Sequence, residues 1–337
     1  MAGNPMQKLK ILYLLDIFKQ YTDEEHPLSA AELCEKLAGR GVPAERKSIY
    51  SDIEALQRYG VEILSTRQPK AGYFLVTRDF ELPEVRLLID AVQAAGFITA
   101  RKTRLLTGKL ERLVSESQAG KIQRQMYVDS RNKCENEEIY YNIDLLNKAI
   151  EDAKKVELTY SRRQLEENRR IVTASRQFVI SPYALTWMND HYYLIGNNQK
   201  YDNLMHLRVD RMRRVQVLEE AARPFQEVSP YTERFDTADY VSRVFNMFGG
   251  QLQKIDLRCK SGLLEQVLDR FGESIFIRDG GEGHFVFTVS AQVSEGLIGW
   301  LLQFGDGIEV LSPADLRNQM GEKIAALQKM YREDKEK

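Results

Sequence analysis

Four arginines, Arg208, Arg211, Arg213 and Arg214, fall within seven residues of the segment from Ser181 to Leu218. A guanidinium group is planar, permanently charged and suited to two-pronged binding of phosphate or carboxylate. Tyrosines lie near these arginines in the sequence, and aromatic rings stack on nucleotide bases. The pattern predicts a site for an anionic ligand with flat rings, such as a cyclic nucleotide or a short single-stranded oligonucleotide. The candidate ligand-binding residues are Tyr183, Tyr192, Tyr193, His206, Arg208 and Arg211.

Strand geometry places a condition on this site. Side chains alternate between the two faces of a strand, so Arg208 and Arg211, three residues apart, would point to opposite faces. Both can serve one site only if the strand breaks near Asp210; if it runs straight, Arg211 is a surface residue. The arginines are also compatible with a solvated strand end that has a basic face. His206 and Tyr183 are weaker candidates. For His206 the reason is that a lone histidine on a strand is usually a hydrogen-bonded part of the structure.

A second group of polar residues lies near the N-terminus. Three predicted helices precede two short strands around a turn at residues 66–72. Ser29 and Glu32 form a capping box for the second helix. The third covers residues 45–59, ends at Gly60 and turns Ile49, Ile53 and Leu56 inward. This is the layout of a winged helix-turn-helix, whose third helix meets base edges and phosphates. The candidate DNA-binding residues are Arg46, Lys47, Ser48, Tyr50, Ser51, Arg67 and Lys70. A winged helix that binds protein instead of DNA remains an alternative.

The composition limits the other possibilities. Lysine plus arginine (48) nearly equals aspartate plus glutamate (49), so the overall charge gives no support for nucleic-acid binding. The three cysteines are scattered in no metal-ligand spacing, which fits a reducing compartment. The four histidines form no local metal site, and no nucleotide-binding or catalytic motif is present. We therefore expect no metal, no cofactor, no catalytic residues and no membrane partner. The lack of a signal-peptide core makes a cytoplasmic protein the expectation.

Hydrophobic periodicity predicts an α+β protein of several domains. Residues 1–80 form the winged helix-turn-helix, and residues 81–140 form apolar helices that pack either on a partner subunit or on their own chain. Many short strands over residues 141–220, among them 156–160 and 177–180, predict a small barrel or sandwich. Residues 221–249 are a linker. Residues 250–337 follow a βαββαβ order, which is that of a ferredoxin-like unit.

Two motifs resemble one known family. The run from Lys47 to Leu56 (KSIYSDIEAL), followed by Tyr59-Gly60, resembles the recognition helix of WYL-domain transcriptional regulators with a DeoR-type N-terminus. It differs by lysine, serine and serine at positions 47, 48 and 51, where the family has arginine, threonine and arginine. Tyr192-Tyr193-Leu194 stands in place of Trp-Tyr-Leu, and Leu207–Met212 (LRVDRM) is similar to the family signature F-R-L-D-R-I.

The resemblance covers nearly the whole chain. It implies a WYL ligand-sensing domain with a small Sm/SH3-like β-barrel over residues 141–220, and a C-terminal WCX domain over residues 250–337. It also implies that Arg208 and Arg211 line the ligand site. The leading hypothesis is a homodimeric, ligand-responsive transcriptional regulator that binds a double-stranded DNA operator. The alternatives are a nucleic-acid-binding accessory module that regulates a partner enzyme in a defence system, and an enzyme whose site is assembled from distant residues.

Overall fold

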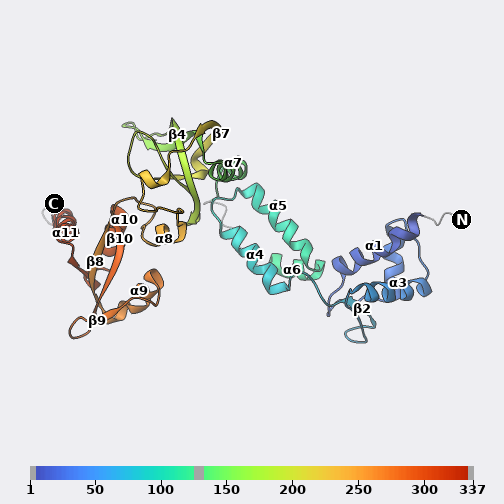
Figure 1. Cartoon of the computed structure of the whole chain (residues 1–337). Helices are drawn as coiled ribbons and strands as arrows, with labels where there is room; N and C mark the ends of the chain where they lie inside the picture. Colours follow the sequence, from blue (N-terminus) through green and yellow to red (C-terminus); the bar gives the residue numbers. More distant parts are fainter. Residues whose placement is uncertain (1–4, 125–132, 333–337) are drawn as a thin grey trace. The chain divides into compact units, whose positions relative to one another are not determined.

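The computed structural model describes residues 5–124 and 133–332 of the 337-residue chain. The chain divides into two compact units, Met1–Glu135 and Asn136–Lys337. Their helices and strands, many of which are labelled in Figure 1, make a mixed α and β protein with an N-terminal run of helices and several sheets. Within the described ranges, no helix is both long and apolar enough to cross a membrane.

The first unit begins with three helices and a hairpin, in the order expected for the winged helix-turn-helix. Three helices, α1 (Pro5–Tyr21), α2 (Ala30–Gly39) and α3 (Arg46–Tyr59), precede an antiparallel hairpin of β1 (Ile63–Thr66) and β2 (Gly72–Leu75). All five elements contribute to one apolar core. Its fully or nearly fully buried members are Leu14, Ile17, Phe18, Leu33, Leu37, Ile49, Ile53, Leu56, Ile63 and Leu75. This shared core fixes α3 and the hairpin relative to each other.

Local sequence signals set the helix boundaries. The Ser29 hydroxyl accepts a hydrogen bond from the Glu32 amide, and the Glu32 carboxylate accepts one from the Ser29 amide, which forms the predicted capping box of α2. The third helix ends at Gly60, whose φ of +105° lies in the left-handed region that glycine adopts without strain. Both signals are local, which is why the sequence predicts them.

The wing lies against the segment before α2. Tyr73 and Leu28 exchange two backbone hydrogen bonds of 2.8 and 2.9 Å, which adds a short third strand to the hairpin. A Cβ atom at Gly72 would stand 2.7 Å from the Leu28 carbonyl carbon, closer than real Cβ atoms approach backbone. Glycine at position 72 therefore permits the close approach of the wing.

The buried face of α1 does not include Leu9 and Leu12. Leu9 is 40% exposed and Leu12 is 57% exposed, whereas Leu14, Ile17 and Phe18 are completely buried. Apolar residues recur at helical spacing on more than one face of this leucine-rich helix, so the sequence pattern alone does not show which face is buried. Packing against α2 and α3 selects the face.

Helices α4 (Leu82–Ala94), α5 (Ala100–Leu110) and α6 (Glu116–Arg124), with the 3₁₀ turn η1 (Glu111–Leu113), complete the first unit. Their core contains Val85, Ile89, Val114 and Ile122. They are tied to the winged helix, because the Ser115 hydroxyl donates to the Asp23 carboxylate. These helices thus pack at least partly on their own chain, although leucines at 87 and 105 remain exposed.

The second unit begins with helix α7 (Ile139–Glu151) and a five-stranded antiparallel sheet. The strands are β3 (Lys154–Leu165), β4 (Ile171–Met188), β5 (His191–Asn197), β6 (Met205–Arg208) and β7 (Met212–Ala221). Their order in the sheet is β6-β5-β4-β3-β7. Among the described strands, β6 and β7 lie at the two edges and do not pair with each other, so the sheet does not close into the expected Sm/SH3-like barrel.

Strands β3 and β4 are much longer than the expected strands at residues 156–160 and 177–180. The arginine-rich segment between those short strands is not an irregular connection. It continues both strands into a two-stranded arm, with Leu165 opposite Ile171 at its end. Because both faces of this part of β3 and β4 carry polar side chains, no alternation of apolar and polar residues indicates strands here.

The C-terminal part has the predicted βαββαβ order. It contains β8 (Gln251–Lys260), α9 (Leu264–Phe271), β9 (Ile277–Asp279), β10 (His284–Val293), α10 (Glu295–Leu302), β11 (Ile308–Ser312) and α11 (Ala314–Arg332), with 3₁₀ turns η5 (Ser261–Leu263) and η6 (Gly305–Gly307). The antiparallel strand order is β11-β8-β10-β9. The glycines at 280, 281 and 283 lie in the hairpin turn between β9 and β10.

The last helix is less buried than its apolar stripe predicts. Leu316 and Met320 join the core, but Ile324 and Leu327 are exposed and Tyr331 is 81% exposed. The helix is longer than the strand on which its first half packs. Burial therefore stops after about two turns.

The segment between β7 and β8 contributes to two cores. It contains η4 (Phe225–Glu227) and the short helix α8 (Thr237–Ser242). Tyr240, Val244 and Met247 pack with Ala184 and Ile195 of the five-stranded sheet. Phe245, in contrast, belongs to the core of the C-terminal part. The Arg270 guanidinium stacks over the Phe245 ring at 4.1 Å and donates to the Val244 carbonyl.

Candidate nucleic-acid interface and ligand site

The third helix presents one polar face to solvent. Ile49, Ile53 and Leu56 are buried beneath it. Arg46, Lys47, Tyr50 and Ser51 are exposed on the first two turns, as expected for residues that would contact DNA. The Ser48 hydroxyl donates to the Glu45 carbonyl instead, and Ser48 is half-buried. Two acidic residues are paired, Asp52 with Lys10 at 2.7 Å and Glu54 with Arg58 at 2.7 Å, which supports structural roles for both.

The two wing residues behave differently. Arg67 is exposed in the turn between β1 and β2. The Lys70 ammonium instead donates to Glu32 over 2.5 Å. That hydrogen bond, together with one from the Ser29 amide, lowers the pKa of Glu32 to about 2. Lys70 therefore holds the wing against α2. Because Glu32 already neutralises its positive charge, Lys70 would attract a DNA phosphate less strongly than an unpaired lysine would.

A pocket of about 410 Å³ lies where the wing, α3 and the start of α2 meet. Its lining includes Ser29 and Ala30 at the N-terminus of α2, Tyr50 on α3, and Arg67 in the wing. The Tyr50 ring lies 6.2 Å from that of Tyr73, another lining residue. Unpaired backbone amides at a helix N-terminus attract anions. The pocket thus brings polar groups from three elements to one concave place.

In the second unit, β6 breaks near Asp210, which is the condition under which Arg208 and Arg211 can serve one site. Strand β6 ends at Arg208, and the 3₁₀ turn η3 (Val209–Arg211) follows. The Arg208 guanidinium donates two hydrogen bonds to Asp210, over 3.0 Å from Nε and 2.7 Å from Nη2. Burial lowers the pKa of Arg208, but the hydrogen bonds and negative charge of Asp210 outweigh this effect and raise it. Arg211 is exposed.

The break brings both arginines near the same side chains. Desolvation is the main cause of a lowered pKa at His191, and the positive charges of Arg208 and Arg211 add to it. Desolvation raises the pKa of Tyr193, and the same two arginines oppose that rise. Tyr193 lies directly opposite Arg208 on the neighbouring strand. We call His191, Tyr193, Arg208, Asp210 and Arg211 the arginine cluster.

His191 was not among the candidates from the sequence. Its Nδ1 atom is buried and has no hydrogen-bond partner among the described residues. Buried polar atoms are usually hydrogen-bonded, so an exception beside two arginines marks a candidate ligand contact. The signal in the sequence was its position two residues before Tyr193, which places both side chains on one face of β5.

The remaining candidates lie elsewhere. Tyr192 points to the opposite face of β5 from Tyr193 and stacks on Trp187 at 6.4 Å. Tyr183 donates to the Arg223 carbonyl over 2.8 Å and packs against the rings of Phe225 and Phe235, and burial raises its pKa to about 12. Tyr183 is therefore part of an aromatic cluster. The structure does not bring all six predicted ligand residues together.

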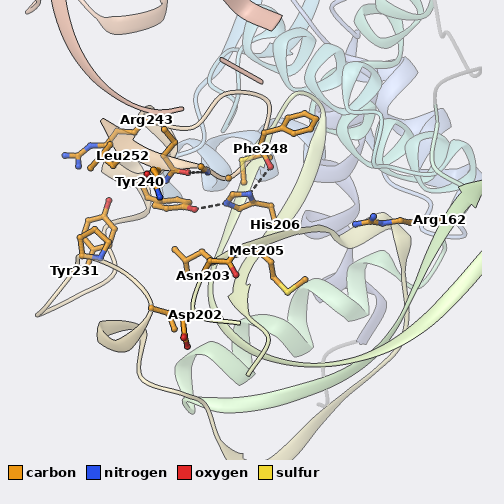
Figure 2. A pocket seen from close by; sticks show the side chains of 18 residues that line it. Arg162, Asp202, Asn203, Met205, His206, Tyr231, Tyr240, Arg243, Phe248 and Leu252 are labelled. Carbon is orange, nitrogen blue, oxygen red and sulfur yellow. Dashed lines mark hydrogen bonds between the residues drawn. The ribbon is translucent and has the colours of Figure 1, made fainter. Parts of the chain in front are cut away.

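His206 lines a separate pocket of about 700 Å³, shown in Figure 2. Strand β6 and the turn before it, the segment before β8 and the start of β8 line most of it, and Arg162 of β3 and Gln292 of β10 line it as well. Neither Arg208 nor Arg211 is among its lining residues. Two charged residues in its wall are already paired, Arg243 with Asp239 at 2.5 Å and Asp202 with Arg223 at 2.9 Å. The volume suits a small molecule.

Both ring nitrogens of His206 are engaged, as the dashed lines in Figure 2 show. The Met247 carbonyl can only accept, so Nδ1 carries the proton and donates over 2.8 Å. Burial lowers the pKa of His206 to about 4, so the ring is neutral near pH 7, and Nε2 accepts from the Tyr240 hydroxyl over 2.9 Å. His206 holds the segment before β8 onto β6.

This arrangement predicts a pH-dependent stability. The unfolded histidine has a pKa of 6.5 and the folded one about 4, so the unfolded state binds a proton first as the pH falls. The contribution of His206 is complete above pH 6.5 and declines between pH 6.5 and about pH 4, by at most about 1.4 kcal/mol per pH unit. Urea unfolding across this range should show a shallower slope in His206→Gln than in the wild type. Equal slopes would contradict the assignment.

No group of three or more histidine, cysteine, aspartate or glutamate side chains suited to a metal ion occurs among the described residues. None of the three cysteines forms a disulfide.

Family models match the five-stranded sheet and the βαββαβ part separately. Residues 141–217 match the model of the WYL domain, and residues 251–328 match that of the WCX domain. The chain therefore contains a WYL domain and, C-terminal to it, a WCX domain. The segment that contributes to both cores lies between the two matches.

A relative and two solved structures resemble this chain. The uncharacterized HTH-type transcriptional regulator YobV of Bacillus subtilis (strain 168) is 22% identical over 295 residues, which cover 85% of this chain and 89% of that protein. Proteasome accessory factor B/C (PafBC) of Arthrobacter aurescens is 17% identical with a TM-score of 0.27, over 94% of this chain and 46% of that one. A CRISPR Cas-related protein is 14% identical with a TM-score of 0.37, and the match covers 98% of this chain and 86% of that one.

Proposed function

We propose that this protein is a transcriptional regulator that binds operator DNA through its winged helix and an anionic ligand through its WYL domain. The observation that carries the proposal is the exposed polar face of α3 beside the wing, in a chain that also contains a WYL domain. The similarity to a protein named as an HTH-type transcriptional regulator supports it.

The winged helix supplies the DNA contacts. Arg46, Lys47, Tyr50 and Ser51 face the major groove from the first turns of α3, which is where a recognition helix reads base edges. Arg67 contacts the phosphate backbone from the wing. The N-terminus of α2, which lines the same pocket as Arg67, offers backbone amides to a neighbouring phosphate.

Neutralising α3 tests the DNA-binding half. We expect Arg46→Gln/Lys47→Gln to weaken binding to the promoter next to its own gene by about tenfold or more, with a salt slope lower by about 0.9 for each phosphate that is no longer neutralised. The matched control is Arg101→Gln/Arg104→Gln, which removes two exposed charges from α5 and should change neither quantity. Mobility shifts and fluorescence anisotropy at several salt concentrations measure both. Equal affinities of the two variants would refute this interface.

The arginine cluster is the proposed anion site. Arg208 uses Nε and Nη2 for Asp210, which fixes the guanidinium and leaves other N–H groups to donate. Arg211 is exposed and, within the described part of the chain, forms no ion pair with a carboxylate. The partnerless Nδ1 of His191 lies within the same cluster. A phosphate held by these groups would explain all three features.

Arg211 gives the cleanest test of the ligand site, because its removal leaves no buried charge behind. We expect Arg211→Gln to lower affinity for a short single-stranded DNA oligomer or a cyclic nucleotide by about tenfold, the effect of one charged hydrogen-bonded contact. Arg214→Gln is the control, since Arg214 is also exposed and lies on β7 beyond the turn. Calorimetric titration gives the affinities, and promoter binding without ligand should be unchanged. If the two variants bind alike, the cluster is not the site.

For a ligand to regulate DNA binding, it must bind more tightly to one arrangement of the protein than to another. We propose a homodimer in which ligand binding changes the separation of two winged helices, which needs a difference in ligand affinity between the two arrangements. Promoter footprints with and without ligand would detect this change. A footprint that is absent under every condition would favour the accessory-module alternative.

A further inference from the structure

The arm formed by β3 and β4 extends beyond the rest of its sheet. Strand β7 pairs with β3 only as far as Tyr160, and β5 pairs with β4 only from Ser181 onward. Residues 161–165 and 171–175 therefore pair only with each other among the described strands. At the usual strand rise, five residues extend roughly 17 Å. We call residues 161–176 the arm.

The tip of the arm is an ordered turn. The Glu166 amide donates to the Arg170 carbonyl over 2.9 Å, and the Arg169 amide donates to the Glu166 carbonyl over 2.9 Å. The Asn168 side chain accepts from the Arg170 amide and donates to the Glu166 carboxylate. These bonds hold the two strands together at the end of the arm.

Five arginines lie on the arm, against two glutamates, and all five are exposed. They are Arg162, Arg163, Arg169, Arg170 and Arg176. In the part of the chain that the structure describes, none of them forms a salt bridge, whereas nearby Lys154, Lys155 and Arg223 each pair with a carboxylate. The arm thus carries a net charge of about +3, and no carboxylate among the described residues forms a salt bridge with its arginines.

The arginines are distributed around the arm. Arg163 projects from one face, Arg162 and Arg176 project from the other, and Arg169 and Arg170 lie in the turn. Arg162 lies over the Tyr160 ring at 5.4 Å and Arg176 over the Phe178 ring at 5.9 Å, which orients these two guanidinium groups at the base. Positive charge on both faces suits a groove that has phosphates on both sides.

We propose that the arm binds duplex DNA by entering the major groove, with its arginines on the flanking phosphates. The major groove admits a two-stranded β-ribbon. Exposed apolar residues at the tip, Leu165 and Ile171, offer surface to thymine methyl groups. Single-stranded nucleic acid fits less well, because such sites use exposed rings for base stacking. On the arm's base, Tyr160 is buried and Phe178 is half-buried.

This inference goes beyond the proposed function, since it adds a DNA contact in the second unit that is independent of α3. It also separates the arm from the anion site, because neither Arg208 nor Arg211 belongs to the arm. The arginine–phosphate contacts of the arm would raise affinity for DNA of any sequence, since phosphate contacts do not read bases.

The test uses the full-length chain and a duplex of unrelated sequence. We expect Arg163→Gln/Arg169→Gln/Arg170→Gln to weaken duplex binding by about tenfold or more and to lower the salt slope by about 2 to 3. The matched control is Lys200→Gln/Arg234→Gln/Lys254→Gln, which removes three exposed charges from the same unit. The control should retain wild-type affinity and slope. Thermal unfolding of both variants checks that the fold is intact.

The outcomes separate the arm from the winged helix. The arm substitutions should weaken duplex binding by the same factor when combined with Arg46→Gln/Lys47→Gln, because the two contacts are distinct. Equal duplex affinities of the arm variant and its control would overturn the proposal while leaving the winged helix untouched. Loss of single-stranded DNA binding with unchanged duplex binding would overturn it as well. Loss confined to the α3 variant would support the winged helix alone.

Discussion

Gly296→Ala should lower the free energy of unfolding of the second unit by about 3 kcal/mol. Gly296 is buried near the start of α10, and a Cβ atom there would stand 2.2 Å from the Phe245 carbonyl oxygen and 3.0 Å from its carbon. These are backbone atoms of a segment packed in two cores, so they cannot move aside as a flexible side chain would. Separating α10 from that segment would expose apolar surface.

Gly299 provides a matched control on the same helix. A Cβ atom at Gly299 meets nothing within 4 Å, so Gly299→Ala should stabilise the protein by about 0.5 to 1 kcal/mol through helix propensity. Urea unfolding followed by the fluorescence of Trp300, also on α10, would report both variants. Similar stabilities of the two alanine variants would contradict the close contact with Phe245.

Arg208→Ala should destabilise the protein by about 2 kcal/mol because it leaves the Asp210 carboxylate without its partner. The side chain of Asp210 is only 11% exposed and that of Arg208 is 23% exposed. Removing one member of a largely buried ion pair leaves an uncompensated charge, whereas removing both members can be nearly neutral. We therefore expect Arg208→Ala/Asp210→Ala to be more stable than Arg208→Ala alone.

The four unfolding free energies of this double-mutant cycle measure the interaction directly. A positive coupling energy of the pair is the expected result, and additive effects would show that the pair contributes little. The cycle also matters for the ligand site. A loss of ligand binding in Arg208→Ala would mix the effect of a missing guanidinium with that of a disturbed turn, which is why Arg211→Gln is the better probe.

The sequence predicted the features that depend on local signals. The capping box at Ser29 and Glu32, the glycine at the end of α3 and the buried face of α3 all arise within one helix, and the structure has each of them. The order of elements in the C-terminal part was also predicted, since its helices and strands alternate with clear turns.

The features that the sequence did not predict depend on contacts between distant residues. Lys70 pairs with Glu32, and His206 pairs with Met247, over about forty positions in the sequence. The residues next to each partner do not indicate where in the sequence the other lies. Arg211 could be placed only once the strand was seen to break into η3. The arm was missed because its strands are polar on both faces, so no apolar alternation marks them.

The segment of residues 222–250 limits how proteins of this architecture can exchange parts. A chimera joined at residue 250 would combine a foreign WCX domain with a Phe245 that evolved to fill a different core. One joined at residue 218 would instead place foreign side chains at Tyr240, Val244 and Met247 against the native sheet. Neither junction leaves both interiors intact, so the two domains are expected to be inherited together with the residues that join them.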